Sequence, residues 1–216
     1  MSIKIPEPPV PKVWVLDANV LFSDWARALL VCLSRQHQAQ LCWSDMIADE
    51  VFRNLVRLNR LSPTDAEMQR SGMAELMQGR ILPPANPVYF LDLKPVDEKD
   101  RHVAALALDL HHQHQSMIGL ITWNSKDFPR KPLMKKGIVR YSPDDLMFAL
   151  MPQPDEGRRL LLDSLNEVVV FKNKLPLQEP TEYLNRARPW PNSTESWHDF
   201  LSRNRMHRVS KLISAE

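Results

Sequence analysis

Short apolar runs alternate with longer amphipathic segments through the first 150 residues of this 216-residue chain. Such alternation is typical of a parallel sheet with helices on its faces. The clearer runs are continuous and rich in β-branched or bulky residues, as expected for strands covered on both sides. The expected strands are Val13–Leu16, Ala39–Trp43, a weaker one at Val88–Leu93, Met117–Thr122 and Gly137–Tyr141. We therefore predict an α/β fold with helix, sheet and helix layers and about five parallel strands.

Two amphipathic helices that carry acidic residues are expected between these strands. The first follows a cap at Ser44 or Asp45, has apolar residues at helical spacing and contains Glu50. The second begins near Asp97, and Asp100 is expected in its first turn, on the side of the buried apolar stripe.

Polar residues follow two of the predicted strands. Asp17 comes directly after Val13–Leu16, and the loop Trp123–Pro129 follows the strand that ends at Thr122. Open α/β sheets bind ligands at the carboxyl ends of their strands. If these two strands are neighbours, Asp17 and the loop come within reach of one ion.

The acidic residues together predict a metal site. Carboxylates that are held close to one another repel, and a positive charge normally offsets that repulsion. Asp97 has two readings, as a helix cap or as a second ligand from the same segment as Asp100. The candidate ligands are Asp17, Glu50, Asp97, Asp100 and Asp127.

The cysteine content and the termini indicate a cytoplasmic protein. Cys32 and Cys42 lie in apolar or aromatic surroundings without metal-ligand spacing, and we expect buried reduced thiols. No apolar segment approaches the ~18 residues of a membrane span, and residues 1–11 form a Pro-rich, polar N-terminal arm.

Two basic stretches are candidates for contact with a polyanion, although the net charge of the chain is only +2. The alternative is that they are solvated surface charges. The second stretch runs from Arg186 to Lys211 and is interleaved with Trp190 and Trp197. The first stretch ends at Arg140, and its candidate residues for contact with the polyanion are Lys126, Arg130, Lys131, Lys135 and Lys136.

The segments that carry these acidic residues resemble the PIN-domain family, in particular the VapC-type toxins of bacterial toxin–antitoxin pairs. The resemblance covers residues from about 12 to 150. Each segment alone is a weak signal, so the resemblance depends on the order and spacing of the four segments together. The four segments, in order, are residues 15–21, 44–51, 97–107 and 121–129.

The resemblance implies a three-layer PIN-like fold in which Asp17, Glu50 and Asp100 bind Mg²⁺ or Mn²⁺, with Asp97 as a contributor. Many relatives have an acid two residues after the threonine, where this chain has Asn124. Asn124 can ligate through its carbonyl oxygen or hold a metal-bound water, or Asp127 can supply the missing charge. Catalytic roles are thus expected for five residues, namely Asp17, Glu50, Asp100, Asn124 and Asp127, and not for Asp97.

The activity implied is metal-dependent hydrolysis of RNA phosphodiester bonds by the toxin of a type II toxin–antitoxin pair. Its expected partners are the RNA substrate and a cognate antitoxin, in a homodimer or a toxin–antitoxin hetero-oligomer and without a membrane. One alternative is a non-catalytic PIN-fold module that binds RNA or protein. A phosphotransferase with Asp17 as nucleophile is disfavoured, because no second acid stands two residues later.

We divide the chain into the arm at 1–11, a PIN-like nuclease domain at 12–150 and a helical C-terminal extension at 151–216. Ser142 and Pro143 mark the start of the last helix of the domain, and the Pro-containing segment after Leu150 ends it. Three short helices are expected beyond it. The extension has three possible uses, namely packing on the core, gripping RNA or contacting an antitoxin; packing is the expectation for Trp197 and Phe200.

Overall fold

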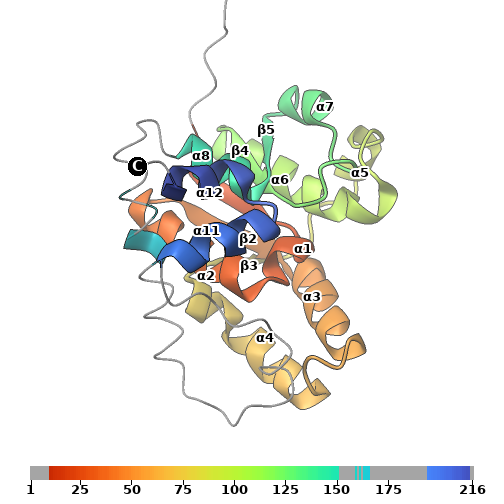
Figure 1. Cartoon of the computed structure of the whole chain (residues 1–216). Helices are drawn as coiled ribbons and strands as arrows, with labels where there is room; N and C mark the ends of the chain where they lie inside the picture. Colours follow the sequence, from red (N-terminus) through yellow and green to blue (C-terminus); the bar gives the residue numbers. More distant parts are fainter. Residues whose placement is uncertain (1–9, 151–158, 160, 162, 166–193, 215–216) are drawn as a thin grey trace, which may run out of the picture.

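The computed structural model describes residues 10–150, 159, 161, 163–165 and 194–214, and it has an α/β architecture (Figure 1). The strands are β1 (Val13–Leu16), β2 (Gln40–Ser44), β3 (Arg80–Leu82), β4 (Ile118–Ile121) and β5 (Ile138–Tyr141). The helices are α1 (Ala18–Leu21), α2 (Asp24–Gln36), α3 (Asp45–Arg57), α4 (Pro63–Met77), α5 (Tyr89–Asp92), η1 (Glu98–Asp100), α6 (Arg101–His114), α7 (Arg130–Met134), α8 (Pro143–Ala149), α11 (Thr194–Arg203) and α12 (His207–Ser214).

All five strands are parallel, and their order across the sheet is β3-β2-β1-β4-β5. The central strand β1 pairs with β2 on one side and with β4 on the other, where Leu16 lies opposite Ile121. The carboxyl ends of β1 and β4 are therefore adjacent. This confirms the prediction that the residue after β1 and the loop after β4 meet at one edge of the sheet.

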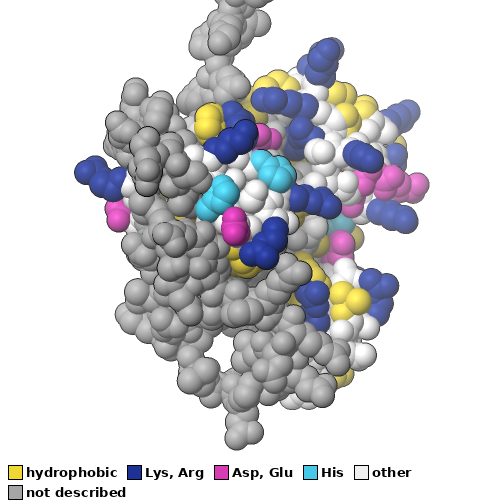
Figure 2. Space-filling view, viewed as in Figure 1, with side chains coloured by type: hydrophobic (Ala, Val, Ile, Leu, Met, Phe, Trp, Pro, Cys, Tyr) yellow, Lys and Arg dark blue, Asp and Glu magenta, His cyan; other side chains and the backbone are white. Residues whose placement is uncertain are grey.

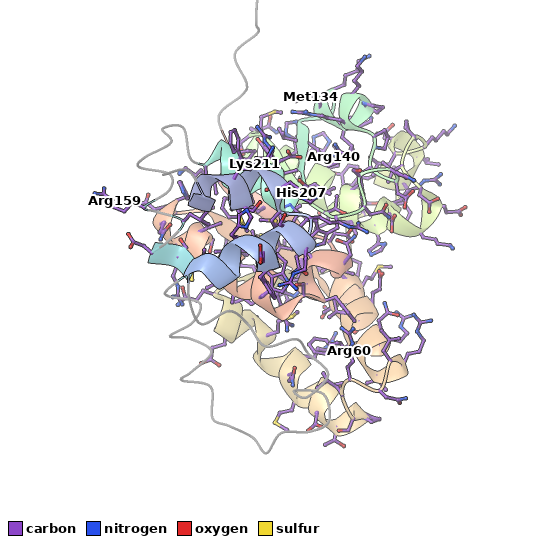
Figure 3. All side chains as sticks on the ribbon, viewed as in Figure 1. Arg60, Met134, Arg140, Arg159, His207 and Lys211 are labelled. Atoms are coloured by element: carbon purple, nitrogen blue, oxygen red, sulfur yellow. The ribbon has the colours of Figure 1, made fainter. Side chains whose placement is uncertain are left out.

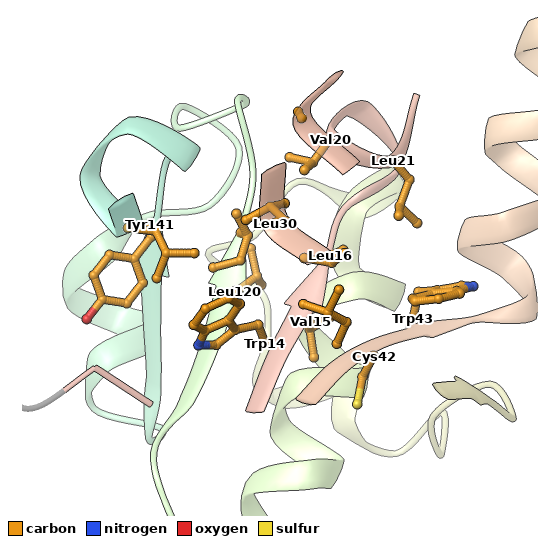
Figure 4. Close-up of a cluster of buried hydrophobic side chains, with 14 of the residues drawn as sticks. Trp14, Val15, Leu16, Val20, Leu21, Leu30, Cys42, Trp43, Leu120 and Tyr141 are labelled. Carbon is orange, nitrogen blue, oxygen red and sulfur yellow. The ribbon is translucent and has the colours of Figure 1, made fainter. Parts of the chain in front are cut away.

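Side chains on both faces of the central strands are buried, as a three-layer architecture requires. Neighbouring strand residues point to opposite faces, yet every residue of β4 is buried. Helix α6 packs against β1, β2, β4 and β5, whereas α2 and α3 contact β2 and α8 contacts β5. Figure 4 shows Leu16, Leu120 and Trp43 within this core, and each of them is fully buried.

Four of the five predicted strands are confirmed, and the weaker one is wrong. Residues Tyr89–Asp92 form helix α5 instead of a strand. No residue of this helix is buried, and Leu91 is 70% exposed, whereas Leu93 and Val96 beyond its end are buried. The run looked like a strand because its apolar residues are contiguous, and contiguity alone does not separate a strand from a short helix.

The remaining strand is β3, which was not predicted. It has only three residues, between Gly79 and Pro83. Gly79 permits a close approach, because a Cβ atom added there would lie 2.2 Å from Cζ3 of the buried Trp43 ring. A strand this short, whose residues are no more than half-buried, leaves too little apolar pattern to detect.

The helix caps are largely as predicted. Ser44 is the N-cap of α3, and its hydroxyl accepts a hydrogen bond from the N–H of Ile47. Asp97 caps the 3-10 helix η1 and accepts from the N–H of Lys99. Asp100 departs from the prediction: it is the last residue of η1 and the N-cap of α6, so it precedes the first α-helical turn instead of lying within it.

The described part of the C-terminal extension is helical and packs on the core. Phe200 is buried and meets the ring of Trp25 edge to face, with centroids 5.5 Å apart. This confirms the packing expected of Phe200. The side chain of Trp197 lies outside the described residues, as do the other apolar positions of the extension on which helices were expected: Val168, Val169, Tyr183 and Leu184.

Helix α12 is fixed to α8 by a buried carboxylate. Asp144 accepts hydrogen bonds from the backbone N–H groups of Arg208 and Val209, at 3.0 and 2.9 Å. These two N–H groups belong to the first turn of α12, where a helix has no partner of its own for them. Asp144 thus supplies the cap of α12 from an element more than sixty residues earlier in the chain.

Both cysteines are buried and neither forms a disulfide, as predicted. Burial raises the pKa of Cys42 to about 11, so its thiol stays protonated at neutral pH. In the described segments, no helix combines the length and the apolar character needed to cross a bilayer.

Candidate metal centre

Asp17 lies at the carboxyl end of β1 and is only 4% exposed. Its carboxylate accepts hydrogen bonds from the N–H of Ala18 at 2.7 Å, from the hydroxyl of Thr122 at 2.6 Å and from the amide of Asn19. Burial raises the pKa of Asp17, the hydrogen bonds from Thr122 and Ala18 oppose this, and the charge of Glu50 reinforces it. The side chain is therefore oriented by three donors while its charge is only partly offset.

Thr122 and Asn19 connect the ends of β1 and β4. The Asn19 amide donates to the Thr122 hydroxyl at 3.1 Å, and its carbonyl oxygen accepts from the N–H of Trp123 at 3.0 Å. The N–H of Asp17 also donates to the carbonyl of Ile121. This network holds the loop after β4 against Asp17. The pairing of β1 with β4 and these polar side chains therefore both place the loop beside Asp17.

The Asn124 amide lies between two carboxylates. Its Nδ2 donates to Asp127, and it lies 3.5 Å from Oδ2 of Asp100. The Asn124 backbone N–H donates to the Thr122 hydroxyl at 2.9 Å. The structure thus brings Asn124 and Asp127 together at one corner, and Asn124 presents its amide nitrogen, not its carbonyl oxygen, to the acids.

Asp100 is half-buried among other carboxylates. Burial, and to a smaller extent the charges of Asp17, Asp127 and Asp97, together raise its pKa to about 6, while the charge of His102 opposes the rise. Asp97 is connected to the opposite loop, since its N–H donates to the carbonyl of Asp127 at 3.2 Å. Asp17, Asp97 and Asp127 therefore each act electrostatically on Asp100.

Glu50 approaches the site from α3, across a hollow of about 640 Å³. Its Oε2 lies 3.8 Å from Nε2 of His102, and the Glu50 side chain is 42% exposed. Asp100 and His102 line the same hollow, with Arg53 and Lys99 as the basic residues. Glu50 therefore belongs to the acidic site but is more open to solvent than Asp17.

Sequence reasoning missed three residues of this site: Asn19, Thr122 and His102. Asn19 and Thr122 lie in the segments 15–21 and 121–129 that carry the resemblance, but they are uncharged, and their contacts with Asp17 depend on the pairing of β1 with β4. His102 is two residues after Asp100 in α6, and its Nδ1 lies 2.8 Å from the carbonyl of Lys99. The spacing of His102 from the acids was a signal available in the sequence.

The acidic and amide side chains of this site are of the type that binds a hard divalent cation, although they do not form a coordination sphere. Carboxylate and amide oxygens are the ligands that Mg²⁺ and Mn²⁺ prefer. The raised pKa values of Asp17 and Asp100 indicate that positive charge is in deficit around them. Among the described residues, no three His, Cys, Asp or Glu side chains are close enough together to hold one ion. Ion binding would thus require side-chain movement, for which Glu50 has room.

The basic residues predicted to bind RNA lie on the loop after β4 and around α7. Arg140 donates from Nη1 to the carbonyl of Ser125 at 2.7 Å, so it braces this loop. Figure 2 shows Lys and Arg side chains scattered over the described part of one face, with the largest group of Asp and Glu beside α5. Four of the predicted residues are exposed and the fifth, Lys136, is half-buried; the exposed ones are Lys126, Arg130, Lys131 and Lys135.

No family model, curated protein or solved structure matches this chain. The function has to be argued from the residues and their geometry.

Proposed function

We propose that this chain is a Mg²⁺- or Mn²⁺-dependent endoribonuclease of the PIN-domain type, acting as the toxin of a type II toxin–antitoxin pair. The observation that carries the proposal is the half-buried position of Asp100 among Asp17, Asp97 and Asp127 at the carboxyl edge of the sheet. The pKa of Asp100 is raised to about 6 by burial and by Asp17, Asp127 and Asp97. A bound cation would offset both the burial of these carboxylates and the repulsion between them.

The position of the acids gives further support. They lie at the carboxyl edge of a parallel α/β sheet, where such folds bind ligands. Asp17, Glu50 and Asp100 would hold the ion, with Asp97 and Asp127 adding negative charge beside it. The arrangement needs no nucleophilic side chain, because water attacks the phosphodiester.

The chemistry supplied by a bound divalent cation is polarisation of the phosphoryl group, delivery of water and stabilisation of the leaving oxygen. The chain itself orients the acids for this purpose. Thr122 and Asn19 hold the Asp17 carboxylate in one orientation. Asn124 keeps Asp127 and Asp100 near each other despite their like charges, because its amide donates between them.

The same proposal includes the partners and the compartment. A toxin of this type works in the cytoplasm and is restrained by a small antitoxin, which would cover the acidic cleft. A basic side chain of the antitoxin can take the place of the cation there. Exposed basic residues around α7 would contact the RNA backbone, and the active species would be a homodimer or a complex with the antitoxin.

The decisive experiment is RNA cleavage by purified protein with Mg²⁺ or Mn²⁺, comparing wild type with Asp100→Asn and Asp17→Asn. We expect each substitution to reduce cleavage by at least about 100-fold, since even residues that only orient metal ligands contribute that much. Asp100→Asn is the cleaner variant, because Asp17 accepts three hydrogen bonds that an asparagine cannot all accept.

A matched control is Asp92→Asn, which removes an equal charge from an exposed position on α5. Cleavage by this variant should equal that of wild type. Cleavage that survives Asp100→Asn, or that persists when EDTA removes the metal, would refute the proposed site.

A second candidate is a PIN-fold module that binds RNA or protein without cutting. It is favoured by the amide nitrogen of Asn124, which faces Asp127 and Asp100 where a ligand oxygen would be useful. Titration with Mn²⁺ followed by calorimetry separates the two candidates. The nuclease requires binding that Asp100→Asn abolishes, whereas a module with an impaired site binds no Mn²⁺ and still binds its macromolecular partner.

A further inference from the structure

A second hollow, of about 290 Å³, lies where the C-terminal extension meets the core. Two indole rings and two arginines line it, with no acidic residue among the lining side chains. Its composition is thus opposite in charge to the hollow at Glu50 and Asp100. The lining residues are Ser23, Trp25, Trp123, Arg203, Asn204 and Arg205.

This hollow begins one residue away from the candidate metal centre. Trp123 stands between Thr122, which donates to Asp17, and Asn124, which donates to Asp127. Unlike the side chains of these two neighbours, which contact the acids, the Trp123 ring lies beside Trp25, with centroids 6.3 Å apart. One loop therefore contributes residues to both the hollow and the acidic site.

The two aromatic rings differ in their exposure. Trp25 is buried and is supported from α11 by Phe200, so it forms a rigid base. Trp123 is half-buried and rests on Trp25, which leaves part of its indole accessible from the hollow. A planar ring held in this way is a platform on which a nucleobase can stack.

The arginines add a charge that suits phosphate. Arg203 and Arg205 are exposed, and neither forms an ion pair with a described carboxylate. Arg203 donates from Nε to the carbonyl of Asp199, which orients its guanidinium group. Guanidinium groups bind phosphate oxygens through paired hydrogen bonds and also stack on bases.

We propose that this hollow is a subsite for single-stranded RNA, in which Trp123 stacks with a base and Arg203 and Arg205 bind the adjoining phosphates. The inference rests on the nuclease function proposed above, because it assigns the hollow to the strand whose scissile bond reaches the acidic site. Base stacking requires an unpaired base, so a duplex is not accommodated. The C-terminal extension then contributes directly to substrate binding.

Binding can be tested apart from cleavage, with EDTA present. The probe is a 5′-labelled oligomer of about twelve uridines, a length within the usual site sizes, and the readout is fluorescence anisotropy. The main variant is Arg203→Gln/Arg205→Gly. Arg205 has a φ of 64°, a conformation that glycine adopts more readily, so this variant relieves backbone strain and should fold.

We expect the double variant to bind the oligomer about tenfold more weakly than wild type at low salt. The matched control is Arg80→Gln/Arg159→Gln, which removes the same charge from exposed positions outside the hollow. Figure 3 shows Arg159 at the left edge of the view, apart from His207 near its centre, and His207 begins α12 just after Arg205. The control should bind like wild type; an equal loss in both variants overturns the proposal.

Stacking is tested with an abasic oligomer of equal length, which keeps the phosphates. Wild type should prefer the uridine oligomer by about tenfold, and Trp123→Leu should abolish that preference. An unchanged preference in Trp123→Leu, or none in wild type, overturns the stacking role. If RNA binds through the hollow but no RNA is cleaved, the nuclease function fails while the binding site stands.

Discussion

Two groups of aspartates in this molecule, Asp144 with Asp145 and Asp17 with Asp100, occupy similar positions but differ in how their charge is balanced. Asp17 directly follows β1, Asp144 and Asp145 lie in the first turn of α8, the helix after β5, and each group includes one buried member. Burial opposes ionisation in each case. The outcome depends on whether the chain provides donors and positive charge.

The pair at α8 is neutralised from within the chain. Burial raises the pKa of Asp145, but hydrogen bonds from Ser142 and Arg208 and the Arg208 charge outweigh it, so that its pKa is lowered. Asp144 receives two backbone N–H groups of α12. These acids join the extension to the core, and their function is complete without a ligand.

The acids at the carboxyl edge of β1 and β4 lack such compensation. Asp100 has other carboxylates as neighbours, and its pKa rises to about 6. Among the described residues, His102 is the one whose charge opposes this rise. The comparison teaches that buried acids alone do not mark a ligand site; what marks it is negative charge that the described residues leave unbalanced.

The largest expected effect concerns the compensated pair. Asp144→Ala leaves the N–H groups of Arg208 and Val209 without their acceptor, and we expect a loss of about 3 kcal/mol in the free energy of unfolding. Urea denaturation measures it. The matched control, Asp145→Ala, should lose about 1 kcal/mol, because the Arg208–Asp145 pair is half-exposed. Equal losses would remove the distinction between these neighbours.

The next effect concerns the uncompensated acids. A cation that binds only the folded chain should stabilise it by about 1.4 kcal/mol when Mg²⁺ is at about ten times its dissociation constant. The same concentration should have no effect on Asp100→Asn, and EDTA should reverse the gain in wild type. Thermal unfolding with and without Mg²⁺ measures the difference. Identical gains in wild type and variant would place the ion elsewhere.

Asp100→Asn should also change stability without any metal, and in a pH-dependent way. A carboxyl group whose pKa is raised from 3.8 to about 6 on folding destabilises the folded state as the pH rises through that window. After allowance for solvent screening, the variant should be more stable than wild type by about 1 kcal/mol at pH 8. The gain should vanish near pH 4. A pH-independent difference would mean that charge is not its cause.

The smallest effect is expected at Arg208. Arg208→Gln removes one neutralising charge from Asp145 and should cost about 0.5 kcal/mol, since both side chains are half-exposed. It should also raise the pKa of Asp145. Because a lowered pKa gives stability that is lost as the pH falls below 3.8, the variant should lose less stability in acid. An NMR titration of the carboxyl group measures the shift.

The apolar pattern was sufficient for most of the fold and for part of the site. The continuous runs of β1, β2, β4 and β5 are strands because their residues are buried on both faces. The sequence was insufficient where few apolar residues set the structure. The prediction omitted β3, which is three residues long, and assigned a strand to Tyr89–Asp92, a helix that has no buried residue of its own.

By itself, the sequence determined which acids follow core elements, since position along a strand or helix is a local property. Only the tertiary structure decided their environment. The adjacency of β1 and β4 places Thr122 and Asn19 around Asp17 and brings Asn124 between Asp100 and Asp127. Burial and charge repulsion depend on distances through space. The tertiary structure also decides that Trp123 and Arg205 line one hollow, because α11 packs on the core and brings the segment after it close to Trp123.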